Sequence, residues 1–142
     1  MANDFLQIPI NAELITRQKN LKRCSLNDSV ADMMHLIIIT HFGEYKQDVS
    51  FGNELWEHDF ETIENIQAFK ENLSESLQKA IIQHEKRLTD VKVGIGFEQV
   101  LTTVYNRRVR QRIQINIEGT LRKTNETFTH QELFFMGPLS YY

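Results

Sequence analysis

The sequence has few of the residues that cross-link or punctuate a chain. Its 142 residues include one cysteine, two prolines and six glycines. The single Cys24 can form neither an intramolecular disulfide nor a cysteine cluster around a metal, which favours a reducing compartment. No uninterrupted apolar run exceeds the four residues Leu36–Ile39, far short of the roughly 18 of a membrane span. With no signal-peptide pattern at the start, we expect a cytoplasmic chain that does not insert into a membrane.

The sequence also lacks an excess of basic charge. Sixteen Lys and Arg residues stand against nineteen Asp and Glu residues, which gives a formal net charge of -3. Such a balance provides no general attraction to nucleic acid, so a nucleic-acid partner is not expected. The length is that of one ordinary domain, and 41% hydrophobic residues are enough to build its core.

Hydrophobic periodicity predicts two main helices. Ser25 with Asp28 resembles a capping box with a shorter acid, and apolar residues at helical spacing then predict a helix from Leu26 to Thr40. No period holds from His41 to Phe60, which indicates a long loop with aromatic anchors. A second helix is predicted by one apolar stripe. Its members are Ile66, Phe69, Leu73, Leu77, Ala80, Ile81, His84 and Leu88.

After Leu88 the period changes from helical to alternating. Alternation predicts strands at Val91–Phe97, Val109–Leu121 and Thr127–Met136, with a loop at Glu98 to Asn106 and a turn at Thr124-Asn125. The fold class is therefore α+β: two main helices packed on a small three-stranded, mainly antiparallel sheet. Residues 1–24, in which Leu6, Ile8 and Ile10 alternate, are predicted to form an extended arm, and residues 25–142 a single domain.

Motifs that carry chemistry are absent or weak. The sequence contains no phosphate-binding loop, and Gly94-Ile95-Gly96 sits within a predicted strand, so no nucleotide cofactor is expected. The five histidines have no metal-ligand spacing, so no metal site is expected. Lys22 and Arg23 could lower the pKa of Cys24, but no catalytic partner is indicated. Carboxylate pairs such as Glu57 with Asp59, or Glu61 with Glu64, could serve glycoside hydrolysis, although a chain with so many acids produces such pairs by chance.

Glu85 is the one residue that the local pattern does not explain. It falls in the last turn of the predicted second helix, where the helix dipole disfavours an anion, and no basic residue lies three or four positions away. Arg87 suits a helix C-terminus, whereas Ile82 lies off the apolar stripe. A partner surface at this helix end would explain both Glu85 and Ile82; chance placement would also explain them.

Three segments resemble the baseplate wedge family of contractile injection machines. Glu85-Lys86-Arg87-Leu88, followed by Val91-Lys92-Val93, resembles the family's Glu-Pro-Arg signature between helix and strand, with Lys86 in place of proline. The loop Phe51-Gly52-Asn53-Glu54-Leu55-Trp56 resembles its Phe-Gly-x-x-Leu-Trp segment. The ending Phe134–Ser140 is similar to its type VI secretion branch, called TssE. The similarity spans Ser25 to Tyr142. Because proline would stop the helix and lysine does not, we expect the helix to continue through Arg87.

The resemblance implies a structural role and no enzymatic activity. Family members sit in a cytoplasmic, membrane-docked baseplate, join larger wedge subunits (TssF-like and TssG-like), and present a sheet from which the first sheath ring grows. The resemblance therefore implies partner-binding roles for Phe51, Gly52, Trp56, Ile82, Glu85, Lys86 and Arg87, and no small-molecule substrate. The alternatives are a lysozyme-like peptidoglycan hydrolase and an adaptor of a phage tail or extracellular injection particle.

Overall fold

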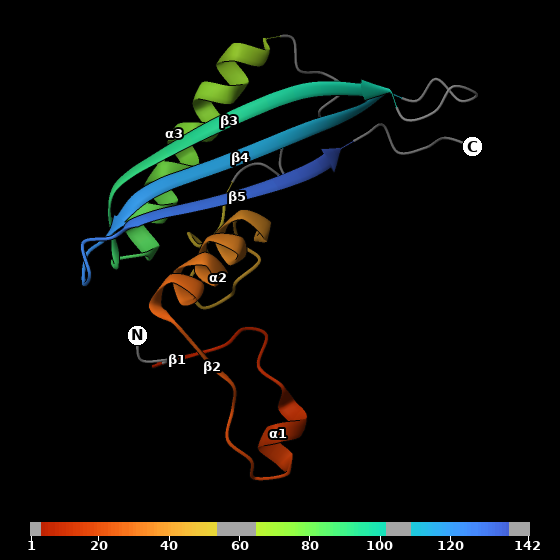
Figure 1. Cartoon of the computed structure of the whole chain (residues 1–142). Coiled ribbons are helices and arrows are strands. Elements are labelled where there is room, and N and C mark those ends of the chain that lie inside the picture. The colour runs from red at the N-terminus through yellow and green to blue at the C-terminus, as the bar shows by residue number, and fades with distance from the viewer. Residues whose placement is uncertain (1–3, 54–64, 102–108, 137–142) are drawn as a thin grey trace, which may run out of the picture.

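The computed structural model describes residues 4–53, 65–101 and 109–136. A small N-terminal lobe precedes a body in which two helices pack on a three-stranded sheet (Figure 1). The predicted α+β class and the antiparallel sheet are confirmed. No helix in the described ranges is long and apolar enough to cross a membrane.

Helix α2 spans Leu26–Ile39 and begins as the sequence predicts. The Ser25 hydroxyl accepts a hydrogen bond from the Asp28 backbone N–H at 3.2 Å, which satisfies one of the free donors of the first turn. The buried face consists of Leu26, Val30, Met34, Ile37 and Ile38. The apolar last turn is thus buried on more than one side, although Ile39 remains exposed.

Helix α3 spans Ile66–His84 and carries the predicted apolar stripe. The Asn65 side chain caps its start by accepting from the Ala68 N–H at 3.1 Å. The buried residues are Phe69, Leu73, Leu77, Ala80 and Ile81, while Glu71, Glu75, Lys79 and Gln83 face solvent. Two predicted members of the stripe differ: Ile66 at its start is 40% exposed, and Leu88 at its end opens the first strand of the sheet.

The sheet has the order β3-β4-β5 and is antiparallel throughout. Its strands are β3 (Leu88–Leu101), β4 (Val109–Leu121) and β5 (Thr127–Met136). Strand β3 runs past the predicted loop start at Glu98, and the remainder of that predicted loop lies mostly outside the described residues. An irregularity between Thr89 and Lys92 shifts the register, so that Val91 is buried like Leu88.

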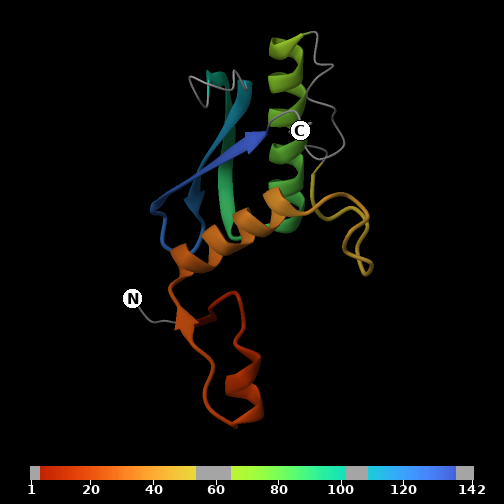
Figure 2. The same ribbon diagram turned by 90° about the vertical axis from the view of Figure 1, so that its right-hand side faces the viewer.

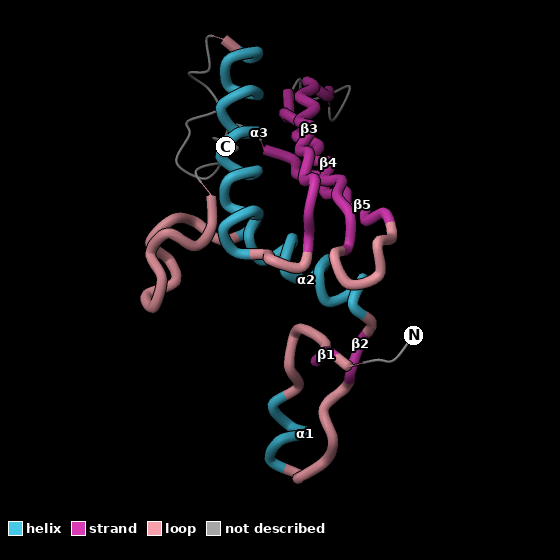
Figure 3. Tube along the Cα trace, turned by 90° about the vertical axis from the view of Figure 1, so that its left-hand side faces the viewer, coloured by secondary structure: helices cyan, strands magenta, loops and turns pink. Residues whose placement is uncertain are grey.

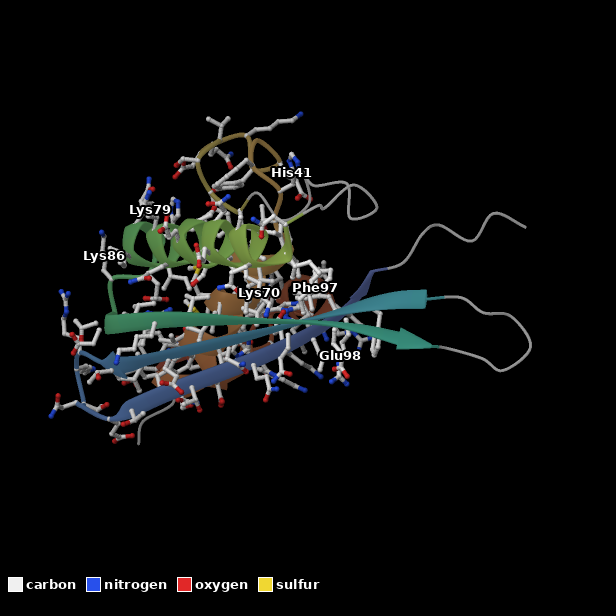
Figure 4. All side chains as sticks on the ribbon, turned by 90° about the horizontal axis from the view of Figure 1, so that it is seen from above. His41, Lys70, Lys79, Lys86, Phe97 and Glu98 are labelled. Atoms are coloured by element: carbon white, nitrogen blue, oxygen red, sulfur yellow. The ribbon has the colours of Figure 1, made fainter. Side chains whose placement is uncertain are left out.

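The two faces of the sheet differ. Helix α3 lies along one face of the sheet and contacts β3. Helix α2 crosses below α3 and lies beside β5 (Figures 2 and 3). Cross-strand partners Val93 with Ile117 and Ile95 with Ile115 point toward the helices, where Phe97 also lies against α3 (Figure 4). The opposite face carries mainly polar residues, among them Glu98, Gln114 and Asn116. This second face is open in the described part of the chain.

The N-terminal segment is more structured than the predicted extended arm. It contains strand β1 (Phe5–Leu6), helix α1 (Ala12–Thr16) and strand β2 (Arg23–Cys24), and β1 pairs antiparallel with β2. The Asn11 side chain caps α1 by accepting from the Glu13 N–H at 3.0 Å. The prediction missed α1 because a five-residue helix shows no periodicity. We call residues 4–24 the N-terminal lobe; Figure 3 shows it projecting away from the body.

Candidate partner-binding site

The chain reverses direction where α3 meets β3, and Glu85 forms the reversal. Helix α3 ends at His84, and Glu85 adopts an extended conformation with φ of -122° and ψ of 94°. Its backbone N–H still donates to the Ile81 carbonyl at 2.8 Å, as a helix cap does. The Glu85 side chain is only 3% exposed. A carboxylate at this depth requires a charged or hydrogen-bonded partner.

Arg87 supplies that partner. Its Nε donates to Glu85 Oε1 at 2.8 Å and its Nη2 to Glu85 Oε2 at 2.7 Å, which is the bidentate geometry of a strong pair. The Arg87 backbone N–H also donates to Oε1 at 3.0 Å. Hydrogen bonding to Glu85 raises the pKa of Arg87 above its already high value, against the opposing effect of burial. The Arg87 guanidinium is therefore charged at neutral pH.

Arg87 also connects separate segments of the chain. Its Nη1 donates to Ser29 Oγ in α2 at 2.8 Å, and its guanidinium carbon lies 5.2 Å from the centre of the Phe5 ring in β1. Its carbonyl accepts from the Arg122 N–H at 2.8 Å, in the turn between β4 and β5. The Arg87 side chain keeps 30% exposure. Three of its five N–H donors are used among the described residues, which leaves two for a partner.

Two expectations about this junction are wrong. The helix does not continue through Arg87, and Glu85 is not an unpaired acid in a helical turn. The two errors have one cause. Lysine at position 86 permits helix, but the long-range contact from Arg87 to Ser29 and the pair with Glu85 accompany an end at His84, three residues earlier than the sequence suggests. Tertiary contacts here override local propensity.

Ile82 and Lys86 form the exposed side of the junction. The Lys86 ammonium donates to the Ile82 carbonyl at 3.0 Å, as a basic residue at a helix C-terminus can. Lys86 lies at the end of α3 and points away from the body (Figure 4). The Ile82 side chain is 52% exposed, which agrees with its predicted place off the apolar stripe.

Gly52 holds the aromatic loop against the end of α2. Its φ of +117° favours glycine, and a Cβ there would lie 2.5 Å from the Thr40 carbonyl oxygen. The next residue, Asn53, is fully buried, and its side-chain amide donates to the carbonyls of Ile37 at 2.7 Å and Ile38 at 2.6 Å. These bonds satisfy free carbonyls at the C-terminus of α2.

Phe51 brings the loop next to the junction. Its ring meets His84 edge-on at 5.0 Å between centroids, one residue before Glu85, and Tyr45 packs on its other side at 5.9 Å. His84 also contacts the Ser50 carbonyl at 3.3 Å. The structure thus brings Phe51 and Gly52 close to the end of α3. Trp56, the seventh candidate residue, lies outside the described residues.

Sequence reasoning missed three residues of this site. Phe5 and Ser29 contact Arg87 from segments far away in the chain, and no local pattern marks them. Asn53 was recognised only as part of a similar segment. Its burial beside a positive-φ glycine could have been inferred from the dipeptide Gly52-Asn53 after a helix end.

Glu132 forms a second polar cluster between β5 and α2. Its Oε1 lies 2.7 Å from His35 Nδ1 and 2.9 Å from His130 Nε2. Burial opposes ionisation of Glu132, but the hydrogen bonds to His130 and His35 outweigh it and lower the pKa of this carboxyl. The histidines are therefore less scattered in space than in sequence. Within the described ranges, no group of three or more ligating side chains has the geometry of a metal site.

Neither set of residues considered for catalysis gains support. Glu57, Asp59, Glu61 and Glu64 all lie outside the described residues. Burial raises the pKa of the Cys24 thiol, and the carboxylates of Asp32 and Asp28 add to the shift. The expectation that Lys22 and Arg23 lower this pKa is wrong, because the raising effects outweigh the opposing charge of Arg87.

These features define a class: an α+β domain with a salt-bridged reversal between its long helix and a three-stranded antiparallel sheet. Residues 24–126 match the family model described as baseplate wedge protein gp25. The chain belongs to this family, and the suspected resemblance is confirmed. No relative among curated proteins matches the sequence.

Two solved structures share the fold. One is a candidate tail lysozyme from Geobacter sulfurreducens, with a TM-score of 0.60 and 19% identity over 85% of this chain and 100% of that chain. The other belongs to the baseplate complex of the type VI secretion system, with a TM-score of 0.57 and 16% identity over 78% of this chain and 93% of that chain. At these identities the likeness concerns the fold alone.

Proposed function

We propose that this protein is a structural subunit of the baseplate of a type VI secretion system. In this proposal it joins the larger TssF-like and TssG-like wedge subunits and gives the first sheath ring a sheet on which to grow. It acts in the cytoplasm, within a baseplate docked at the membrane. The observation that carries the proposal is the family match over residues 24–126, which includes both the junction and most of the sheet.

The sheet supports the role in sheath growth. Strand β5 pairs with β4 on one side, and in the described structure no strand pairs on its other side. An edge strand offers unpaired backbone groups on which another chain can add a strand. Leu133 and Phe135 project from β5 on the open face, and Phe135 is 57% exposed. A strand added beside β5 would place its side chains next to these two residues and bury them.

The junction supports the role in joining wedge subunits. Ile82 and Lys86 are exposed, Arg87 retains two N–H donors, and Phe51 lies beside the end of the same helix. The Glu85–Arg87 pair fixes the guanidinium before a partner arrives, so a partner need not order it. In this proposal Glu85 acts by positioning Arg87, whereas Arg87, Lys86 and Ile82 touch the partner.

The test is co-expression of the full chain with its larger wedge proteins and sheath protein. Wild-type protein should co-purify with the wedge proteins and promote sheath assembly. The Phe135→Asp variant should keep wedge binding and lose sheath assembly, because it puts a charge beside the added strand. Asn116→Asp is the matched control, since it lies on the same face but on the central strand. Equal loss in both variants would contradict a role for the β5 edge.

A lysozyme-like hydrolase is the second candidate, favoured by the structural likeness to a candidate tail lysozyme. Glycosidases generally need two carboxyl groups on either side of the scissile bond, one of them a proton donor. Both oxygens of Glu85 accept hydrogen bonds from Arg87, so the side chain is engaged within the protein and is not directed at a substrate. The expected result with purified protein is no release of sugar from peptidoglycan. If the purified protein does release sugar, and a Glu or Asp substitution abolishes this release, the hydrolase becomes the favoured function.

A further inference from the structure

The N-terminal lobe exposes more apolar surface than its size would lead us to expect. From Asp4 to Arg23 no residue is buried. Four large aliphatic side chains of the lobe are well exposed, with Ile10 at 51%. They are Leu6, Ile8, Ile10 and Ile15. Scattered single apolar residues are normal on a surface, but four within ten residues form a concentration that a partner would cover.

The lobe also encloses a groove. Its volume is about 380 Å³, and it lies between the segment that leads into α1 and the segment that leads to β2. Its lining is mixed: Pro9, Ile10, Leu14 and Leu21 are apolar, whereas Gln7, Asn11 and Lys22 are polar or charged. A cavity of this size is large enough for one or two bulky side chains.

The charge of the lobe is opposite to that of the body. Residues 4–24 contain four basic residues and two acidic ones, whereas residues 25–142 carry a formal net charge of -5. The single lobe ion pair in the described structure joins Arg17 to Glu13, so the exposed Lys19 and Lys22 keep their charge available. An acidic segment is the complementary partner for such a surface.

The lobe is an addition to the family domain that stays attached to the junction. The family match begins at residue 24, the last residue of the lobe. Phe5 covers the face of Arg87, and the Ile8 N–H donates to Asp32 Oδ2 in α2 at 3.4 Å. The lobe is thereby held next to the surface that the proposed function assigns to wedge binding.

We propose that the N-terminal lobe is a second docking element for a larger wedge subunit. Its groove takes an apolar side chain from an acidic segment of that subunit, and Lys19 and Lys22 pair with the flanking carboxylates. The inference rests on the proposed function and extends it beyond the family domain. It identifies the bound segment by chemistry: one bulky apolar residue with acidic neighbours.

Two other occupants fit the observations less well. An anionic membrane surface is held by clusters of basic residues at about 1 kcal/mol each, together with a long apolar face. The lobe has two unpaired lysines and a helix of five residues. A second copy of the chain would have to bring an acidic segment with an apolar anchor. Glu44 and Asp48 lie beside the exposed Tyr45 and Val49. Both of these acids already have partners within the chain, because Glu44 accepts from the His41 N–H at 2.9 Å and Asp48 accepts from the Ser50 N–H at 3.0 Å.

The experiment compares lobe variants with matched controls in co-purification with the larger wedge proteins. The double reversal Lys19→Glu with Lys22→Glu should reduce the recovered wedge protein roughly tenfold or more, because attraction becomes repulsion. The double control Lys79→Glu with Lys123→Glu makes the same charge change on exposed residues of the body. Ile10→Ser should also weaken binding, with Ile66→Ser as its control. Thermal melts should stay within a few degrees of wild type because all six residues are exposed.

Several outcomes would overturn the inference. If wild-type protein binds the wedge subunits and both lobe variants bind equally well, the lobe is not a docking element, while the proposed function stands. If wild-type protein does not bind, the proposed function fails and the inference fails with it. If wild-type protein binds phosphatidylglycerol vesicles and Ile10→Ser does not, the lobe binds a membrane and not a wedge subunit. A dimer in light scattering that the lobe variants abolish would assign it to a second copy.

Discussion

Within the described ranges, seventeen buried residues from Leu26 onward form one continuous apolar core, whereas residues 4–23 of the lobe include none that is buried. The body is held by removal of apolar surface from water, at about 25 cal/mol per Å². The lobe is held by short backbone pairings and by the contact of Phe5 with Arg87. Because a typical hydrogen bond adds only about 1 kcal/mol, the lobe contributes little to global stability. It is therefore free to vary in sequence and carry a binding surface.

The largest expected effect lies in the body. Leu77→Asp places a charge at a fully buried position in the α3 stripe. An unpaired buried charge should cost more than about 4 kcal/mol, enough to unfold the domain. Circular dichroism and a thermal melt measure the loss. A melting temperature within two degrees of wild type would mean that the register of α3 on the sheet is wrong.

The Glu85–Arg87 pair should have the next largest effect, because it lies in the body and Arg87 also contacts Phe5 of the lobe. Glu85→Ala leaves a half-buried guanidinium without its partner and should cost about 2 to 4 kcal/mol, somewhat below the usual loss for a fully buried pair. If Glu85 were an unpaired acid, as its sequence position suggests, Glu85→Ala would have an unchanged or raised melting temperature. Chemical denaturation distinguishes the two, with Glu75→Ala on the exposed face of α3 as the control. Equal stability of both variants would show that the pair adds nothing to folding.

The sequence predicted the parts that periodicity determines. The α3 stripe, the Ser25 cap and the alternation of Ile113, Ile115 and Ile117 all follow from local rules and are confirmed. The end of α3 could not be predicted, because it depends on a contact from Arg87 to Ser29, 58 residues away. Similarity marked Glu85 and Arg87 as candidate site residues, but their mutual bond is a feature of the tertiary structure.

Gly52 should show a moderate effect confined to the loop. Gly52→Ala adds a Cβ 2.5 Å from the Thr40 oxygen at a residue with positive φ, so we expect a loss of about 1 to 3 kcal/mol. Gly43→Ala is the matched control, because Gly43 also has a positive φ but has no atom within 4 Å of the added Cβ. Gly43→Ala measures the cost of placing alanine at a positive φ. The additional loss of melting temperature in Gly52→Ala then measures the clash with Thr40. A larger loss in Gly43→Ala would contradict the close approach at Gly52.

Phe5→Ala tests the attachment of the lobe. It removes the ring from Arg87 and should cost about 1 kcal/mol, the size of a partly exposed cation–π contact with some lost packing. Hydrogen exchange should increase in β1 and β2 and stay unchanged in the sheet. Ile15→Ala, at an exposed lobe residue away from this contact, should change neither quantity. A loss comparable to that of Glu85→Ala would mean that the lobe supports the body.

The smallest effect concerns the polar contact between α2 and β5. The folded pKa of Glu132 lies below its unfolded value of about 4.3, so the carboxylate stabilises the fold at neutral pH. This contribution is fully present above the unfolded pKa and is lost as pH falls through the folded pKa. Wild-type protein should therefore lose more stability between pH 6 and about pH 3 than Glu132→Gln does.

The exposed turn variant Glu126→Gln is the control and should follow wild type. Melting temperatures across the range measure the difference, which should stay below about 1 kcal/mol because surface-type pairs add little. If Glu132→Gln and wild type lose stability in parallel, the hydrogen bonds from His35 and His130 do not hold β5 against α2. The Glu132 cluster would then contribute nothing to the acid sensitivity of the body.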